Sequence, residues 1–187
     1  MQTLLKYVSC VLLLIAPYVA GCGGTPQPGA RESEESNKEV VRRFVSAIND
    51  RQLDVLDEIV RPDVVRHSQA TPGLDIRSLE AMKEFLSDDF VAVPDSHMEL
   101  LQLVAEGDHV AYWATYSGTQ QGQMGPFPPT EREFSSDFAG YFRLSDGMIA
   151  EIWVIWDNLT ILTQLGHMPA APGAEMFKAD PGSASPE

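Results

Sequence analysis

The chain has 187 residues, a formal net charge of −14 and a hydrophobic share of 44%. The length suits one ordinary domain with appendages, and the hydrophobic share is typical of a globular protein. No run of lysine and arginine forms a basic patch, so we expect no nucleic-acid partner.

The first 21 residues form a predicted targeting segment. Lys6 precedes an apolar core over residues 8–16, which is too short to span a membrane as a stable helix. Residues 19–22, Val-Ala-Gly-Cys, resemble a bacterial lipobox, in which the signal is cut before the cysteine and the thiol of Cys22 carries a lipid. The alternative is an ordinary secretory signal in which the cysteine occurs by chance.

The lipobox interpretation places the protein outside the cytoplasm, anchored to a bacterial membrane through Cys22. Gly23 follows the cysteine, where an aspartate would resemble an inner-membrane retention signal, so outer-membrane sorting stays open. Cys10 leaves with the signal, and the mature domain then has neither a free thiol nor a disulfide.

Composition sets the expected domain limits. Residues 22–35 are rich in Gly, Pro, Ser and Glu and are predicted to be a flexible tether. Residues 168–187 have a similar composition and are predicted to be a disordered tail. The folded domain is therefore expected to cover residues 36–167.

The first half of this domain has helical periodicity. Ser36 and Glu39 fit a capping box that opens a helix reaching residue 48. A short helix follows near Gln52, then a short strand over residues 64–67. Ser78 is predicted to cap a third helix, whose apolar face carries Leu79, Met82, Phe85, Leu86 and Phe90.

The second half has the period of strands. Four strands are predicted over residues 98–105, 109–119, 131–144 and 148–156, and a short helix follows from Asn158 to Gly166. Helices followed by antiparallel strands indicate an α+β fold with the helices on one face of the sheet. The last strand is apolar on both faces, which favours a homodimer through the sheet. Alternatively, loops or the C-terminal helix cover its second face.

Several short patterns, in this order, resemble the SnoaL-like polyketide cyclase (ester cyclase) family of the nuclear transport factor two-like superfamily. They include Val-Arg-His-Ser at 65–68, Ala-Glu-Gly-Asp at 105–108, Pro-Pro-Thr at 128–130 and Trp-Asp-Asn-Leu at 156–159. The resemblance implies a cone-shaped, curved antiparallel sheet wrapped by N-terminal helices, of the cystatin-like type. It also implies an apolar pocket in which an aspartate performs acid/base chemistry without metal or cofactor.

The resemblance places Asp157 at the position of the family's catalytic aspartate and His67 near the pocket mouth. The side chains expected to contact a ligand are Tyr112, Phe138, Trp153 and Gln120. Gln120 stands where related sequences often have histidine after Gly-Thr. The identity of a second polar group beside Asp157 in the pocket is therefore left open. The residues themselves leave two interpretations of Asp157. Desolvation among tryptophans would raise its pKa, whereas capping the next helix would lower it.

No metal site is expected. The sequence lacks His-x-x-x-His, and its Glu106-x-x-His109 pattern falls in a predicted turn. Two functions follow as hypotheses. One is a metal-free cyclase-type enzyme for a small apolar carbonyl compound of polyketide-like chemistry. The other is a non-catalytic, membrane-anchored lipoprotein that binds an apolar ligand in the cone.

Overall fold

The computed structural model describes residues 28–71 and 73–169 of the chain. The predicted signal, Cys22 and nearly all of the predicted tail lie outside the described residues. Within the described ranges, the chain forms one five-stranded sheet with helices packed against it. No helix in this part of the chain combines the length and the apolar character needed to cross a membrane.

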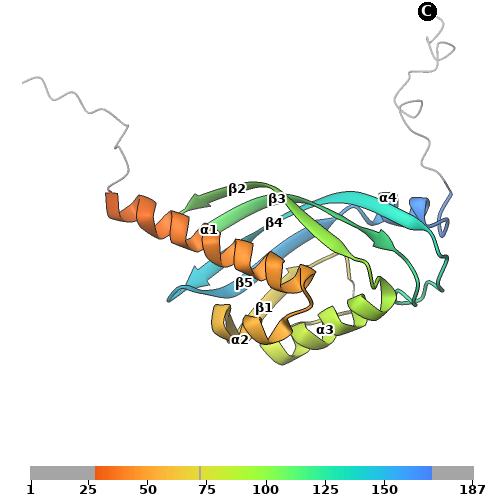
Figure 1. The fold of residues 1–187 in the computed structure, drawn as a ribbon, viewed down its shortest axis with the longest axis horizontal. Helices are drawn as coiled ribbons and strands as arrows, with labels where there is room; N and C mark the ends of the chain where they lie inside the picture. Colours follow the sequence, from red (N-terminus) through yellow and green to blue (C-terminus); the bar gives the residue numbers. More distant parts are fainter. Residues whose placement is uncertain (1–27, 72, 170–187) are drawn as a thin grey trace, which may run out of the picture.

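The sheet has the strand order β1-β5-β4-β3-β2 (Figure 1). Its strands are β1 (Val60–Ser68), β2 (His97–Glu106), β3 (His109–Thr119), β4 (Glu133–Ser145) and β5 (Met148–Trp156). The predicted α+β class is confirmed, and β2 to β5 have the expected antiparallel pairing. β1 is the exception, because it pairs in parallel with β5. The long connection between these two strands in the chain makes a parallel crossover possible.

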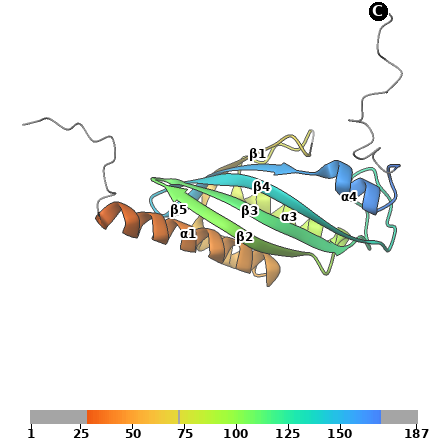
Figure 2. The ribbon, with the colours of Figure 1, turned by 90° about the horizontal axis from the view of Figure 1, so that it is seen from above.

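The helices are α1 (Pro28–Asn49), α2 (Leu56–Ile59), α3 (Leu79–Ala92) and α4 (Asn158–Gln164), with a 3-10 turn at Leu53–Val55. Figures 1 and 2 show α1 and α3 against the same face of the sheet, while α4 lies at one end of it. Ser78 caps α3 as predicted, because its side chain accepts a hydrogen bond from the backbone nitrogen of Ala81.

Helix α1 begins earlier than the sequence indicated. It starts at Pro28, so Ser36 lies inside the helix and does not cap it, and the predicted tether is helical from residue 28. Proline suits the first helical position because its missing N–H would have no partner there. Asn37 then donates a 2.9 Å hydrogen bond to the carbonyl of Gly107, which fixes the helix to the turn between β2 and β3.

Strand alternation separates two faces of the sheet. On β3, Val110, Tyr112, Ala114 and Tyr116 are buried under the helices, whereas Trp113 faces outward. This alternation follows from the two-residue period of a strand. The inner face holds the core, and the outer face is free of helices among the described residues (Figure 2).

Candidate functional site

An apolar cavity of about 70 Å³ lies between the helices and the inner face of the sheet. Side chains from α1, α3 and all five strands line it. Tyr112 and Phe138, two of the predicted ligand contacts, are among them, as is Trp156. The rings of Phe138 and Trp156 stack with centroids 4.2 Å apart, so part of the cavity lining is a pair of stacked aromatic rings.

Arg66 is the charged side chain in this lining. It lies on β1, and its residue is only 8% exposed. Its Nη1 donates a 3.2 Å hydrogen bond to the Thr71 hydroxyl, and its guanidinium lies 4.8 Å from the ring centroid of Phe85. Burial lowers the pKa of Arg66, although a guanidinium keeps its proton in a protein. A largely desolvated positive charge therefore lies in the wall of the cavity.

Tyr112 supplies a second polar group to the cavity. Its hydroxyl has no hydrogen-bond partner within the described residues, and burial raises its pKa, so it keeps its proton. The residue opposite on β4 is Gly140, where a Cβ atom would stand 2.8 Å from the Tyr112 hydroxyl oxygen. The missing side chain at Gly140 therefore makes room for this hydroxyl on the inner face.

Half-buried Asp89 and buried Tyr116 form a pair outside the lining of the cavity. The Tyr116 hydroxyl donates a 2.8 Å hydrogen bond to the Asp89 carboxylate. Burial raises the pKa of the Asp89 carboxyl, while that hydrogen bond and the charges of Arg51 and Arg66 act in the opposite direction. Asp89 also follows the cavity-lining Phe85 by four residues on α3, which places it on the same helical face.

Asp157 is not in this cavity. It is exposed at the end of β5 and is the N-cap of α4. Its carboxylate accepts hydrogen bonds from the backbone nitrogen and the hydroxyl of Thr160, and these lower its pKa. The expectation of a desolvated carboxyl with a raised pKa is therefore wrong, and the helix-cap interpretation describes the observed geometry.

His67 and Trp153 also lie away from the cavity, on the outer face of the sheet. Their rings stack with centroids 4.5 Å apart, and Trp153 stacks in turn on Tyr141 at 4.4 Å. The His67 ring is 3.0 Å from a carboxylate oxygen of Glu151, and Arg143 donates to the other oxygen at 2.8 Å. This arrangement is a surface aromatic row with an ion cluster, and it does not converge with Asp157.

Gln120 is fully buried, but its partners belong to the loop that it begins. Its amide nitrogen donates to the carbonyls of Phe127 and Pro128, and its amide oxygen accepts from the Thr130 hydroxyl at 2.9 Å. The ring Nε2 of His167 lies 2.9 Å from the same oxygen. The predicted ligand contact at Gln120 therefore has a structural role, because the loop already occupies its hydrogen-bonding groups.

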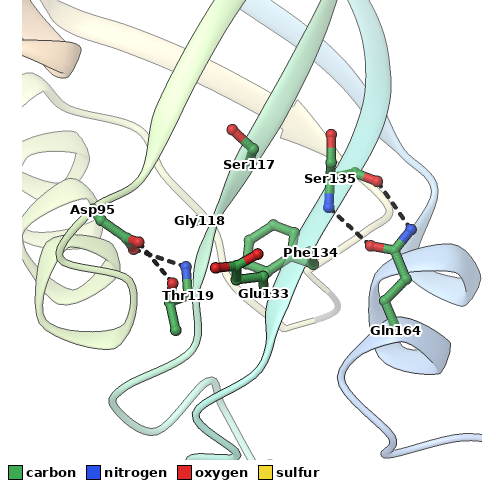
Figure 3. A pocket seen from close by; sticks show the side chains of 8 residues that line it. All are labelled: Asp95, Ser117, Gly118, Thr119, Glu133, Phe134, Ser135 and Gln164. Atoms are coloured by element: carbon green, nitrogen blue, oxygen red, sulfur yellow. Dashed lines mark hydrogen bonds between the residues drawn. The ribbon is translucent and has the colours of Figure 1, made fainter.

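A second, open hollow of about 640 Å³ lies at the far end of β3 and β4, next to α4 (Figure 3). Asp95 accepts hydrogen bonds from the backbone nitrogen and the hydroxyl of Thr119, both at 2.7 Å. Gln164 exchanges two hydrogen bonds with the backbone of Ser135. These contacts tie the turn after α3 to β3 and tie α4 to β4. Within the described part of the chain, the hollow and the apolar cavity share no lining residue.

Two site residues could not be foreseen as such. Arg66 lies one position before His67, and Asp89 lies in a helix whose apolar face was correctly predicted. The signal for both was periodicity. Arg66 lies two residues after buried Val64, on the same strand face, and Asp89 lies two helical turns after buried Met82. Across residues 28–71 and 73–169, no three His, Cys, Asp or Glu side chains gather as a metal site would require.

The fold has known counterparts. The family model for SnoaL-like polyketide cyclases matches residues 38–165. IdmH of Streptomyces antibioticus, provisionally a polyketide cyclase, is 31% identical with a TM-score of 0.62; the match covers 70% of this chain and 98% of IdmH. TsrD of Streptomyces laurentii is 28% identical with a TM-score of 0.64, over 72% of this chain and 97% of TsrD.

AclR of Streptomyces galilaeus, provisionally a hydroxylase, is 26% identical with a TM-score of 0.66. That match covers 78% of this chain and 90% of AclR. No curated protein matches the chain significantly. The family match spans well over half of the sequence, and similar solved structures share the fold over most of their length. The chain belongs to the SnoaL-like polyketide cyclase family.

Proposed function

We propose that the protein is a cyclase-type enzyme that acts on a small apolar carbonyl compound by metal-free acid/base chemistry in the cone cavity. The observation that carries this proposal is that the side chains of Arg66 and Tyr112 take part in the lining of a mainly apolar cavity. The family membership supports a cyclase-type role, and the cavity supplies the groups for it.

Ring closure by carbon–carbon bond formation begins when a proton leaves the carbon next to a carbonyl group. The negative charge that develops on the carbonyl oxygen has to be stabilised. A guanidinium and a neutral phenol hydroxyl in an apolar cavity suit this task, because their interaction with an oxyanion is stronger there than in water. Arg66 and Tyr112 are therefore proposed as the oxyanion-stabilising groups.

The proton acceptor in this proposal is Asp89. Burial raises the pKa of its carboxyl, which makes its ionised form a stronger base than a carboxylate in water. The hydrogen bond from Tyr116 holds the carboxylate in one orientation. Asp157 is not given this role, because its oxygens bond to Thr160 and face solvent.

The volume of the cavity limits the substrate. About 70 Å³ is far below the roughly 300–1,000 Å³ of sites for drug-sized ligands. Met82 and Met98 line the cavity and are side chains that change conformation easily. Either the substrate is small, or these methionines move when it binds.

The test is exchange of α-hydrogen for deuterium in small ketones, followed by proton NMR in D₂O. We expect wild-type protein to accelerate exchange above buffer, and Arg66→Met, Tyr112→Phe and Asp89→Asn to reduce it by about a hundredfold each. Asp157→Asn is the matched control for Asp89→Asn and should exchange at the wild-type rate. Loss of exchange in Asp157→Asn with full retention in Asp89→Asn would refute the assignment.

The alternative function, non-catalytic binding of an apolar ligand, is favoured by one observation. The acid at the family's catalytic position caps α4 and is unavailable in the cavity. In this case native mass spectrometry should show the chain with a co-purified apolar ligand, and the ketone exchange assay should show no rate above buffer. Arg66→Met should then release the ligand.

We also propose that Cys22 anchors the protein outside the cytoplasm, on the basis of the lipobox-like residues 19–22. Partitioning between detergent and water tests this directly. The wild-type chain should enter the detergent phase, and Cys22→Ser should remain in the aqueous phase. Equal partitioning of both proteins would contradict the anchor.

A further inference from the structure

Arg51 joins three separate parts of the chain and has an unusual backbone conformation. It follows α1 with φ at 61°, in the left-handed region that an arginine rarely adopts. Its Nη1 donates to the carbonyl of Ile48 at 3.0 Å, and its Nη2 donates to the carbonyl of Pro94 at 2.8 Å and to the carbonyl and hydroxyl of Ser96, both at 3.0 Å. Its guanidinium lies 4.2 Å from the ring centroid of Phe90. The surrounding contacts therefore hold this side chain in one place despite the backbone strain.

The charge of Arg51 has no carboxylate partner within the described residues. The acceptors of its hydrogen bonds are carbonyl and hydroxyl oxygens. Burial raises the pKa of the Asp89 carboxyl and of the Tyr116 hydroxyl, and the charge of Arg51 lowers both. The electrostatic effect of Arg51 is therefore felt at the pair that contains the proposed proton acceptor.

Ser96 connects Arg51 to that pair. It is buried, it accepts from Nη2 of Arg51, and its hydroxyl lowers the pKa of Tyr116 as a hydrogen-bonding neighbour. The Tyr116 hydroxyl in turn donates to Asp89 at 2.8 Å. A guanidinium can only donate and an ionised carboxylate can only accept. The two hydroxyls between them are therefore both oriented as donors toward the carboxylate, and each strengthens the next.

We propose that Arg51 is a positioning residue that keeps the Asp89 carboxylate ionised, through its charge and through the two hydroxyls between them. This inference rests on the proposed function for the role of Asp89 as the proton acceptor. A carboxyl group that already carries a proton cannot take one from the substrate. Arg51 is not among the residues that line the cavity, so its effect on the reaction is indirect.

The cations that act on Asp89 come from two elements. Arg51 after α1 and Arg66 on β1 both lower the pKa of its carboxyl, in opposition to burial. The side chain of Arg66 donates to the hydroxyl of Thr71, whereas that of Arg51 donates to Ser96. Among the described residues, Arg51 is therefore the cation that combines a charge effect with the hydrogen-bonded hydroxyls.

The direct test is the titration of Asp89 in the full chain, followed through the ¹³C NMR signal of its carboxyl carbon, which Asp89→Asn assigns. Arg51→Met should make Asp89 bind its proton about tenfold more tightly than in wild type. Arg43→Met is the matched control, because it removes an exposed arginine of α1 whose partner is Glu58. It should change proton binding by less than about twofold. Equal titration of Asp89 in wild type and Arg51→Met would overturn the inference.

Two milder substitutions decide the question if Arg51→Met does not fold. Arg51→Lys keeps the charge but loses the planar set of donors, and Ser96→Ala keeps the charge but removes the connecting hydroxyl. Each should make Asp89 bind its proton about threefold more tightly than in wild type. Wild-type titration of Asp89 in both variants would show that the hydroxyls do not transmit the effect of Arg51, against the inference.

The pH dependence of ketone exchange separates this role from a purely structural one. The wild-type rate should rise with pH as Asp89 loses its proton and then become constant. In Arg51→Met the rise should occur at higher pH, while the constant rate above it is retained. A lower constant rate with the rise at the wild-type pH would indicate structural damage alone and would contradict the inference.

The two assays fail independently. A change in the titration of Asp89 in Arg51→Met, without ketone exchange by wild type at any pH, would contradict the catalytic proposal and support control of Asp89 by Arg51. Ketone exchange by wild type with an unchanged titration in Arg51→Met would support catalysis and overturn the inference.

Discussion

Asp157 receives two hydrogen bonds from Thr160, one of 3.0 Å from the backbone nitrogen and one of 2.6 Å from the hydroxyl oxygen. This geometry is that of an N-cap, and it accounts for the lowered pKa of the Asp157 carboxyl. A carboxylate in this position stabilises the start of α4 and faces solvent. The proposed reactive carboxyl is therefore that of Asp89 on α3, and not that of Asp157 at the end of β5.

Asp157→Ala should lower the free energy of unfolding by about 1 kcal/mol, because the start of α4 loses its cap. Asp157→Asn should lose less, since an amide oxygen also caps a helix. The pKa of Asp157 is lower in the folded state than in the unfolded state, so its contribution is present above the unfolded pKa. That contribution disappears as the pH falls through the folded pKa. Urea unfolding of the three proteins against pH measures both effects.

Asp89 should show the opposite pH dependence. Its folded pKa is raised by burial, so the folded state binds a proton more tightly than the unfolded state. Its effect on stability therefore becomes less favourable as the pH rises from the unfolded pKa through the folded pKa. The difference in urea midpoint between wild type and Asp89→Asn should change with pH in this direction. A difference that is constant with pH would show that Asp89 titrates normally.

Gln120→Ala should destabilise the protein by about 3 kcal/mol, because it leaves buried polar groups of the loop over residues 120–132 without partners. The loop should also become more accessible to protease. The neighbouring Gln121 is exposed, and Gln121→Ala should change the free energy of unfolding by less than about 0.5 kcal/mol. Similar losses in the two variants would show that the buried network contributes little.

The outer face of the sheet is the proposed homodimer contact. Ile155 on β5 is 76% exposed and Trp113 on β3 is 47% exposed, and both are paired with Ala139 of the intervening strand β4. Exposed apolar groups of this size on one face favour self-association. Light scattering should give a dimer for wild type and a monomer for Ile155→Asp. Val91→Asp is the matched control, because Val91 is 73% exposed on α3, and it should stay dimeric.

Much of the fold could be predicted because its signals are periodic. The alternation along β5 correctly placed Ile152 and Val154 on the side opposite to Trp153. Alternation along β1 places His67 on the face opposite to Arg66, whereas Asp157 comes after the end of β5 and caps α4. The family resemblance suggested their roles but not the faces on which they lie.

The features of the site that were not predicted depend on contacts between residues distant in sequence. Strand alternation places Arg66 on the same face as buried Val64, but arginine is usually exposed, and its burial here follows from the packing of α3 over β1. Likewise, the loop that surrounds Gln120 closes through His167, which is 47 residues away. Tyr112 and Phe138, which were expected to contact a ligand, lie in the cavity lining because regular strand alternation turns both toward the inner face.

The parallel pairing of β1 with β5 determines how much of the chain must be synthesised before the cavity lining is complete. Arg66 on β1 meets its neighbour Ile152 only across this pairing, which joins the first strand to the last. During synthesis from the N-terminus, β1, which carries Arg66, has no sheet partner until β5 and thus nearly the whole domain has left the ribosome. A nascent chain that ends before residue 148 therefore lacks the strand that supplies Ile152, Val154 and Trp156 to the cavity lining.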